Sequence, residues 1–445
     1  MFYAQIAYLC VKIDMDRQAI NTLIKWKAKP NRKPLVMQGV RQVGKTWLIK
    51  EFAKSHYSNF VYINFEKNQR LKSLFEIDFD IERIISILSI ESSLQIDHGN
   101  TLIFFDEIQA AINGITALKY FAEDAPHYHV IAAGSLLGVS LHKGISFPVG
   151  KVDFLNLYPF SFFEFLVALK EDNLAQLILD KPNNRLIFFH DKLIHYLRLY
   201  YYIGGMPEAI STYIQTKDLD EVRDIQAKIL TGYENDFSKY APKEILPRLR
   251  LVWNSIHSQL AKENKKYIFG HVAKGARAKE FEAAISWLND AGLIHKVNLI
   301  TKPVIPLKSY AEMDAFKLYF TDIGLLLAFA EIDKSIILEK NSILTEFKGA
   351  LTEQYVLQQL HCLGHKNLHY WQSDSRKAEV DFLIQSSNEI IPIEVKAEEN
   401  LQAKSLKLYV EKYKPNICIR TSMSAFREDS WLTNVPLYAI LSVDS

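Results

Sequence analysis

The stretch of the chain with the clearest chemistry is residues 39–46, which read GVRQVGKT. They fit the phosphate-binding pattern GxxxxGK[ST], with an apolar strand candidate before them at 33–38 and helical apolar spacing after them at 47–52. Glycines in such a loop let backbone N–H groups curl around phosphate oxygens, and the following helix presents its positive N-terminus. The pattern therefore predicts a binding site for the phosphates of a nucleotide.

Residue types within this loop predict separate roles. Lys45 is expected to reach the β- and γ-phosphates and to act in catalysis, and the Thr46 hydroxyl is expected to ligate Mg²⁺. Further nucleotide contacts are expected from the loop, the start of the next helix, the end of a later strand and a proline in the middle of the chain: Gly39, Gln42, Val43, Gly44, Trp47, Ser135 and Pro207.

Two adjacent acids end a second apolar element, TLIFFDE at residues 101–107. Asp106 fits a carboxylate that organises the metal, and Glu107 fits the group that orients or deprotonates the attacking water. The alternative is a strand that ends in solvated acids. Residues 60–65 and 129–135 read as further strands, so Ser135 is expected either to contact the γ-phosphate at the ligand edge of the sheet or to serve as a cap.

Near the other end of the chain, residues 378–398 read AEVDFLIQSSNEIIPIEVKAE and predict a β-hairpin around a polar turn. If Gln385 pairs with Ile390, Asp381 lies opposite Glu394, and Glu379 lies opposite Lys396. Because side chains alternate along a strand, these four polar residues share one face. The opposite face is then a continuous apolar surface, with these members: Val380, Phe382, Ile384, Ile391, Ile393 and Val395.

Two carboxylates placed directly opposite each other repel, so the polar face of the hairpin needs a compensating charge. A divalent cation would supply it, because Mg²⁺ takes hard oxygen ligands. The alternative is a half-buried hairpin with a solvated face and a Glu379–Lys396 pair.

Composition limits the class of protein. The 445 residues are 49% hydrophobic and 23% charged, with a net charge of +2, which is ordinary for a globular chain of several domains and neither demands nor excludes nucleic acid. The three cysteines form no CxxC pair, so we expect no zinc site and no disulfide framework, and a cytoplasmic location. No apolar run is long enough to predict a membrane segment.

Several motifs together resemble one family. RQVGKT, FFDEIQ, AAGSLLG and LYPFSFFEFL, followed by GGMPEA, FKLYFTDIGLL, FKGALTEQYVLQQL, EVDFLI and PIEVK, are similar to the AAA+-type P-loop ATPases of bacteria and archaea that carry an uncharacterised C-terminal domain. The resemblance implies that ATP and Mg²⁺ are the cofactors and that the chain hydrolyses ATP. One position departs from it: Gly150-Lys151 stands where such proteins usually have Gly-Arg, a candidate arginine finger.

The resemblance also implies an α/β multidomain organisation. We expect a parallel α/β P-loop ATPase core at 15–158, a helical lid at 159–240, a winged helix at 241–335 and a restriction-endonuclease-like α/β domain at 336–445. Within the lid, GGMPE resembles a glycine–proline motif that contacts nucleotide through Pro207, although Gly-Gly and Pro also simply break helices.

The winged-helix segment carries Lys274, Arg277 and Lys279 near the start of its expected second helix, where DNA phosphates could be met. Because Glu280 and Glu282 interrupt this basic group, a protein-docking or purely structural role is the alternative.

Upstream of the hairpin, residues 347–360 read as a helix that carries Glu353 at helical spacing from its apolar residues. Together with Asp381, Glu394 and Lys396, this acid resembles the PD-(D/E)XK nuclease core, in which the acids hold Mg²⁺ and the lysine positions water.

Two functions stay open on the sequence. The first is a Mg²⁺-dependent ATPase coupled to a transaction on DNA or RNA through the nuclease-like module. The second is a nucleotide-gated signalling switch that responds to ATP or ADP and whose C-terminal module only binds a partner. A protein partner docked through the winged helix and an oligomeric assembly are compatible with either one.

Overall fold

The first of two sheets in the described part of the chain is parallel and has five strands in the order β2-β3-β4-β1-β5. The structure, a computed structural model, describes residues 17–134, 148–180, 185–262, 265–338, 345–386, 388–397 and 403–444. The strands of this first sheet are β1 (Leu35–Gln38), β2 (Asn59–Asn64), β3 (Thr101–Asp106), β4 (His129–Ala133) and β5 (Asp153–Asn156).

Helices cover both faces of this sheet, and they are α1 (Ala19–Ala28), α2 (Lys45–His56), α3 (Ile81–Ser92) and α4 (Gly114–Glu123). Alternate strand residues enter two separate cores: Met37 and Phe104 lie with α1 and α2, whereas Ile103 and Phe105 lie with α3 and α4. Strand β3 is buried along its whole length, as expected for a strand covered on both faces. The predicted parallel α/β core is therefore confirmed.

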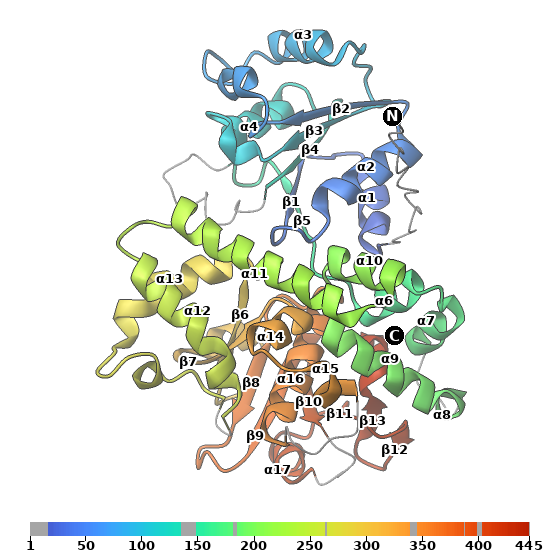
Figure 1. The fold of residues 1–445 in the computed structure, drawn as a ribbon, viewed down its shortest axis with the longest axis vertical. Coiled ribbons are helices and arrows are strands. Elements are labelled where there is room, and N and C mark those ends of the chain that lie inside the picture. The colour runs from blue at the N-terminus through green and yellow to red at the C-terminus, as the bar shows by residue number, and fades with distance from the viewer. Residues whose placement is uncertain are drawn as a thin grey trace, which may run out of the picture.

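A layer of helices lies between the two sheets (Figure 1). Its members are α6 (Phe162–Ala168), α7 (Asp172–Leu179), α8 (Arg185–Phe188), α9 (His190–Ile203), α10 (Pro207–Thr216) and α11 (Leu219–Tyr240). Two shorter groups follow along the chain: α12 (Leu246–Leu260), α13 (Ala278–Asp290), β6 (Ile294–Ile300) and β7 (Ala311–Phe320), then α14 (Ile323–Phe329) and α15 (Lys334–Leu338). Pro207 starts α10 at a position where helices tolerate proline.

The second sheet in the described residues has eight strands in the order β12-β13-β11-β10-β9-β8-β6-β7. Its remaining strands are β8 (His369–Gln372), β9 (Glu379–Ser386), β10 (Glu389–Lys396), β11 (Ile419–Ser422), β12 (Arg427–Glu428) and β13 (Thr433–Pro436), with helices α16 (Thr345–Cys362) and α17 (Lys404–Tyr413). Strand β6 pairs with β8 in parallel. The sheet thus takes strands from both sides of the boundary that the sequence predicts at 335/336.

The β9–β10 hairpin confirms the predicted register, because Gln385 pairs with Ile390 and the ladder continues to Phe382 and Ile393. The prediction of one continuous apolar face is wrong. Val380 pairs with Trp371 and Leu383 with His369, so β9 has one extra residue here, which is a β-bulge. As a result Val380 packs with Leu383 in a small hydrophobic core of its own. Phe382 instead packs in the large hydrophobic core that also contains Met37 and Phe104.

Asp322 joins three parts of the chain. Its carboxylate caps α14 by accepting the Leu325 N–H at 3.0 Å, and it also accepts the Gly205 N–H at 2.6 Å and the Gln358 side-chain amide at 3.0 Å. A Cβ on Gly204, whose φ is +75°, would lie 2.2 Å from Asp322 Oδ1. A glycine at 204 therefore lets the turn between α9 and α10 close on this buried carboxylate.

We expect Asp322→Ala to lower the free energy of unfolding by about 3 kcal/mol or more, because three buried donors lose their acceptor. Urea unfolding of the full chain measures this. The matched control is Asp333→Ala, which removes an exposed Asp that accepts the Ser335 N–H at 2.8 Å. A loss for Asp322→Ala no larger than for the control would contradict the interpretation.

Candidate nucleotide site and C-terminal acid cluster

The loop between β1 and α2 has a backbone that requires glycine at both ends. Gly39 has a φ of +149°, and a Cβ there would lie 2.3 Å from the Leu157 carbonyl oxygen. Gly44 has a φ of +99° and precedes α2 as its N-cap. The curve of the loop therefore depends on residues without a side chain, as expected for a phosphate cradle.

Lys45 is buried inside this curve. Its Nζ donates to the carbonyl oxygens of Gly39 at 2.6 Å and Val40 at 2.9 Å. Burial lowers the pKa of Lys45 to about 8, against the opposing effect of Glu107 and Asp106. The ammonium group is thus poorly compensated, and an anion in the cradle would stabilise its charged form.

Thr46 and Asp106 lie together, as required of a shared metal site. The Thr46 hydroxyl donates to Asp106 Oδ2 at 3.2 Å. The same oxygen accepts from Tyr62 at 2.9 Å and from Asn64 at 3.3 Å. A hydroxyl beside an oriented carboxylate is a hard oxygen donor set, which fits Mg²⁺.

The other predicted contacts lie around this centre. Glu107 has a left-handed backbone with a φ of +52° and accepts a hydrogen bond from Gln109. Gln42 and Trp47 are exposed, whereas Val43 is buried and its carbonyl accepts from Arg17 at 3.3 Å. Ser135 lies outside the described residues.

Helices α10 and α11 lie directly on the loop. A Cβ on Gly44 would be 3.4 Å from Pro207 Cγ, so the start of α10 touches the cradle. The Tyr233 hydroxyl of α11 donates to the Arg41 carbonyl at 3.1 Å.

Lys151 stands at the position where a candidate arginine finger is expected. Its ammonium group forms an ion pair with Glu123 at 2.8 Å.

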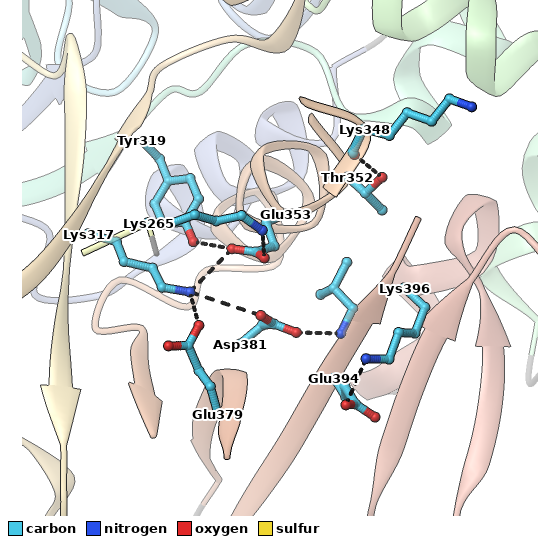
Figure 2. Close-up of polar contacts among 11 residues, drawn as sticks. Lys265, Lys317, Tyr319, Lys348, Thr352, Glu353, Glu379, Asp381, Glu394 and Lys396 are labelled. Carbon is cyan, nitrogen blue, oxygen red and sulfur yellow. Dashed lines mark hydrogen bonds and ion pairs between the residues drawn. The ribbon is translucent and has the colours of Figure 1, made fainter. Parts of the chain in front are cut away.

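The C-terminal acids gather around a lysine (Figure 2). Lys317 of β7 is fully buried, and its Nζ lies 3.3 Å from Glu353, 2.6 Å from Glu379 and 4.0 Å from Asp381. Lys265 pairs with Glu353, and the Tyr319 hydroxyl donates to it at 2.7 Å. We call these six residues the acid cluster: Lys265, Lys317, Tyr319, Glu353, Glu379 and Asp381.

The predicted site of Glu353, Asp381, Glu394 and Lys396 stays a prediction, and two of its members, Glu394 and Lys396, pair with each other on β10. Lys396 pairs with Glu394 at 3.0 Å, and Asp381 accepts the Val395 N–H at 2.8 Å (Figure 2). Asp381 lies in the stretch of β9 that has the extra residue, and its Oδ1 is 4.0 Å from Lys317 Nζ. Among the described residues, no group of three or more His, Cys, Asp or Glu side chains is arranged to hold a metal ion.

Charges within the acid cluster balance internally. Burial opposes ionisation of Glu353, but Lys265 and Lys317 outweigh it and hold the pKa of Glu353 below its usual range. Burial and the nearby Glu353 raise the pKa of Asp381 well above its usual range. Burial also disfavours the Lys317 ammonium, but its carboxylate neighbours raise the pKa of Lys317 overall. Two lysines thus lie beside three carboxyl groups, and of these Asp381 is the one whose pKa is raised.

Three family models match parts of the chain. Residues 31–166 match a model described as an AAA domain. This matched region holds β1, the phosphate loop, α2 and β3, and we call it the AAA domain after the description of the model. Residues 194–335 and 348–440 each match a domain of unknown function, DUF8612 and DUF4143 respectively. A comparison with curated proteins found no match.

Solved structures with partial likeness include three from archaea and bacteria. The Aeropyrum pernix Orc1 protein in complex with DNA is 13% identical with a TM-score of 0.28, covering 71% of this chain and 91% of its own. Pyrobaculum aerophilum Cdc6p has 13% identity, a TM-score of 0.25 and coverages of 75% and 97%. The Thermotoga maritima RuvB Holliday junction branch migration motor is 13% identical with a TM-score of 0.25, and the match covers 66% of this chain and 93% of that structure's chain.

The sequence did not lead us to expect the two lysines of the acid cluster, Lys265 and Lys317. A signal for Lys317 exists, because it is the lone charge in the apolar run AFKLYF at 315–320, and such a charge needs a buried partner. Lys265 sits in the polar stretch KENKKY and has no such signal. Arg41 was visible only as a variable position of the loop pattern, without its partner Asp236.

We expect the affinity for ADP to weaken above pH 8, by up to about tenfold per pH unit, because a growing fraction of Lys45 loses the charge that would pair with phosphate. Calorimetric titrations between pH 7 and pH 9.5 measure it. The control is Lys45→Met, which is expected to bind ADP more weakly and with an affinity that does not change with pH. A flat profile in the unaltered protein would contradict the interpretation.

We expect Lys317→Met to lower the free energy of unfolding by about 3–5 kcal/mol, because it leaves Glu353 and its neighbours as buried, poorly compensated acids. Adding Glu353→Gln to this variant is expected to recover part of the loss. The control is Lys334→Met, which breaks an exposed pair with Asp220 and is expected to unfold like the unaltered protein. Equal unfolding of both lysine variants would overturn the interpretation.

Proposed function

We propose that this protein is a nucleotide-gated switch, in which the AAA domain binds and hydrolyses ATP with Mg²⁺ and the C-terminal sheet is a binding module that does not cut nucleic acid. The observation that carries this proposal is the direct packing of α10 and α11 on the phosphate loop, through Pro207 at Gly44 and Tyr233 at Arg41. Binding of a phosphate in the cradle would therefore directly change the contacts that these two helices make with the loop.

Within the AAA domain, each residue has a physical role in the proposal. Lys45 compensates phosphate charge, and its low pKa makes an anion in the cradle favourable. Thr46 and Asp106 would hold Mg²⁺, which supplies charge neutralisation at the β- and γ-phosphates when bound. Glu107, at the end of β3, orients the attacking water.

The helical layer connects the nucleotide site to the C-terminal sheet. The turn between α9 and α10 is bonded to Asp322, which also accepts from Gln358 of α16. Gln354, on the same helix, bonds both the N–H and the carbonyl of Phe320 at 2.8 Å. These are buried, direct hydrogen bonds, so a movement of α10 would strain contacts within the C-terminal unit.

Metal-dependent cleavage of DNA or RNA through Glu353, Asp381, Glu394 and Lys396 is the rival proposal. Lys317 disfavours it, because its ammonium occupies the position between carboxylates that a cation would need. A divalent ion there would meet the repulsion of two lysines.

The surface at the start of α13 is a candidate contact for the partner of the binding module. Lys274, Arg277 and Lys279 are exposed at the start of α13, as a nucleic-acid contact requires, but so are Glu280 and Glu282. A protein partner or another copy of the chain suits this mixed surface equally well. Among the described residues, no helix combines the length and apolar character needed to cross a membrane.

Hydrogen–deuterium exchange of the full chain tests the switch. With Mg²⁺ and either ADP or a non-hydrolysable ATP analogue, we expect protection in residues 39–56 and a difference between the two nucleotides in α10 and α11. Lys45→Met is expected to abolish both effects. No nucleotide uptake by folded protein, or changes confined to the five-stranded sheet, would refute the proposal.

The same protein, incubated with varied DNA and RNA in Mg²⁺ or Mn²⁺, tests the binding-only module. We expect no metal-dependent product. Cleavage that disappears in Glu394→Ala would show that the C-terminal unit is a nuclease.

A further inference from the structure

Arg41, the third residue of the phosphate loop, is held by helix α11 rather than by the AAA domain. Its guanidinium pairs with Asp236 at 2.5 Å, while its carbonyl accepts from Tyr233 one turn earlier on the same helix. Its side chain is 48% exposed, whereas that of Asp236 is only 7% exposed. The arginine side chain is thus the partner open to solvent, and the carboxylate is the buried one.

This guanidinium also acts on the centre of the phosphate cradle. Arg41 is one of the charges that lower the pKa of Lys45, after burial and against the opposing effect of Glu107 and Asp106. Because these two cations repel each other, an anion bound near them in the cradle is favoured. Lys151, at the candidate finger position, is paired with Glu123 at 2.8 Å.

A γ-phosphate and the Asp236 carboxylate can both bind the Arg41 guanidinium, so a phosphate in the cradle would compete with Asp236 for it. A γ-phosphate offers several charged oxygens to the planar donor fork, which can bind it in a bidentate manner. Asp236 contacts Arg41 through one nitrogen and one oxygen. Burial already raises the pKa of Asp236 although Arg41 opposes it, so the carboxylate is poorly solvated and depends on this partner.

Helix α11 is placed to pass a change at Asp236 onward. Phe237, the next residue, packs against Trp253 of α12 with ring centroids 5.3 Å apart. Trp253 in turn packs at 4.7 Å on Phe320, at the end of β7, the strand that carries Lys317. Figure 1 shows α11 crossing between the two sheets. A displacement of α11 would therefore reach the eight-stranded sheet through packed aromatic side chains.

We infer that Arg41 distinguishes ATP from ADP. The γ-phosphate binds the Arg41 guanidinium in place of Asp236, and this frees the C-terminal end of α11 from its ion pair with the phosphate loop. This inference rests on the proposed function, because it requires nucleotide in the cradle. It assigns to Arg41 contact with the γ-phosphate and to Asp236 the position of Arg41 when that phosphate is missing.

Calorimetric affinities for ADP and for a non-hydrolysable ATP analogue, both with Mg²⁺, test this inference as a ratio. Arg41→Ala is expected to weaken the analogue about tenfold more than ADP, which is the usual effect of losing a charge-assisted hydrogen bond. Asp236→Asn is expected to strengthen the analogue about tenfold relative to ADP. In the double variant, Asp236→Asn is expected to have no further effect on the ratio.

The control variant is Glu91→Gln, which removes the charge of an AAA-domain carboxylate that pairs with Arg70 at 3.0 Å. It is expected to leave the ratio unchanged. If Arg41→Ala does not fold, Arg41→Lys takes its place, because it keeps the charge without the planar donor fork. It is also expected to lower the affinity for the ATP analogue relative to the affinity for ADP. Equal shifts for both nucleotides in the Arg41 and Asp236 variants would overturn the inference, whereas absent binding of either nucleotide by the unaltered protein would instead refute the proposed function.

Discussion

The hydrogen bonds of Asp322 hold the molecule's three parts in one arrangement. This carboxylate is fully buried, and burial raises its pKa even though backbone and side-chain donors from the turn after α9, from α14 and from α16 surround it. A buried acid is tolerated only where its donors are fixed, so these elements constrain one another. The position of α10 over the phosphate loop follows from this constraint, since α10 begins directly after the bonded turn.

Predictions from the sequence succeeded where the determining residues are close together in the chain. The phosphate loop needs only eight consecutive residues and their flanks, and the register of the β9–β10 hairpin is set by its turn. The pairing of Thr46 with Asp106 was accessible because both lie at the same edge of a parallel sheet. In each case local pattern and general sheet geometry are sufficient.

The acid cluster could not be predicted in the same way. Lys317 lies 36 residues from Glu353 in the chain and meets it only because β7 joins the C-terminal sheet beside α16. The bulge in β9 leaves no mark in an alternating pattern of apolar residues, and yet it decides which core receives Val380. The bond between Arg41 and Asp236 spans 195 residues and depends on how the helical layer settles on the AAA domain. Long-range charge pairs of this kind are products of tertiary packing.

The pairing of β6 with β8 has a consequence for how this chain can be divided. Residues on β6, from the second matched region, and on β8, from the third, share a hydrogen-bonded ladder and the hydrophobic cores beneath it. Cutting the polypeptide between them would expose an unpaired apolar edge on each fragment, which is the kind of surface that recruits other strands and aggregates. The two regions of unknown function should therefore be expressed and purified together as a single folding unit.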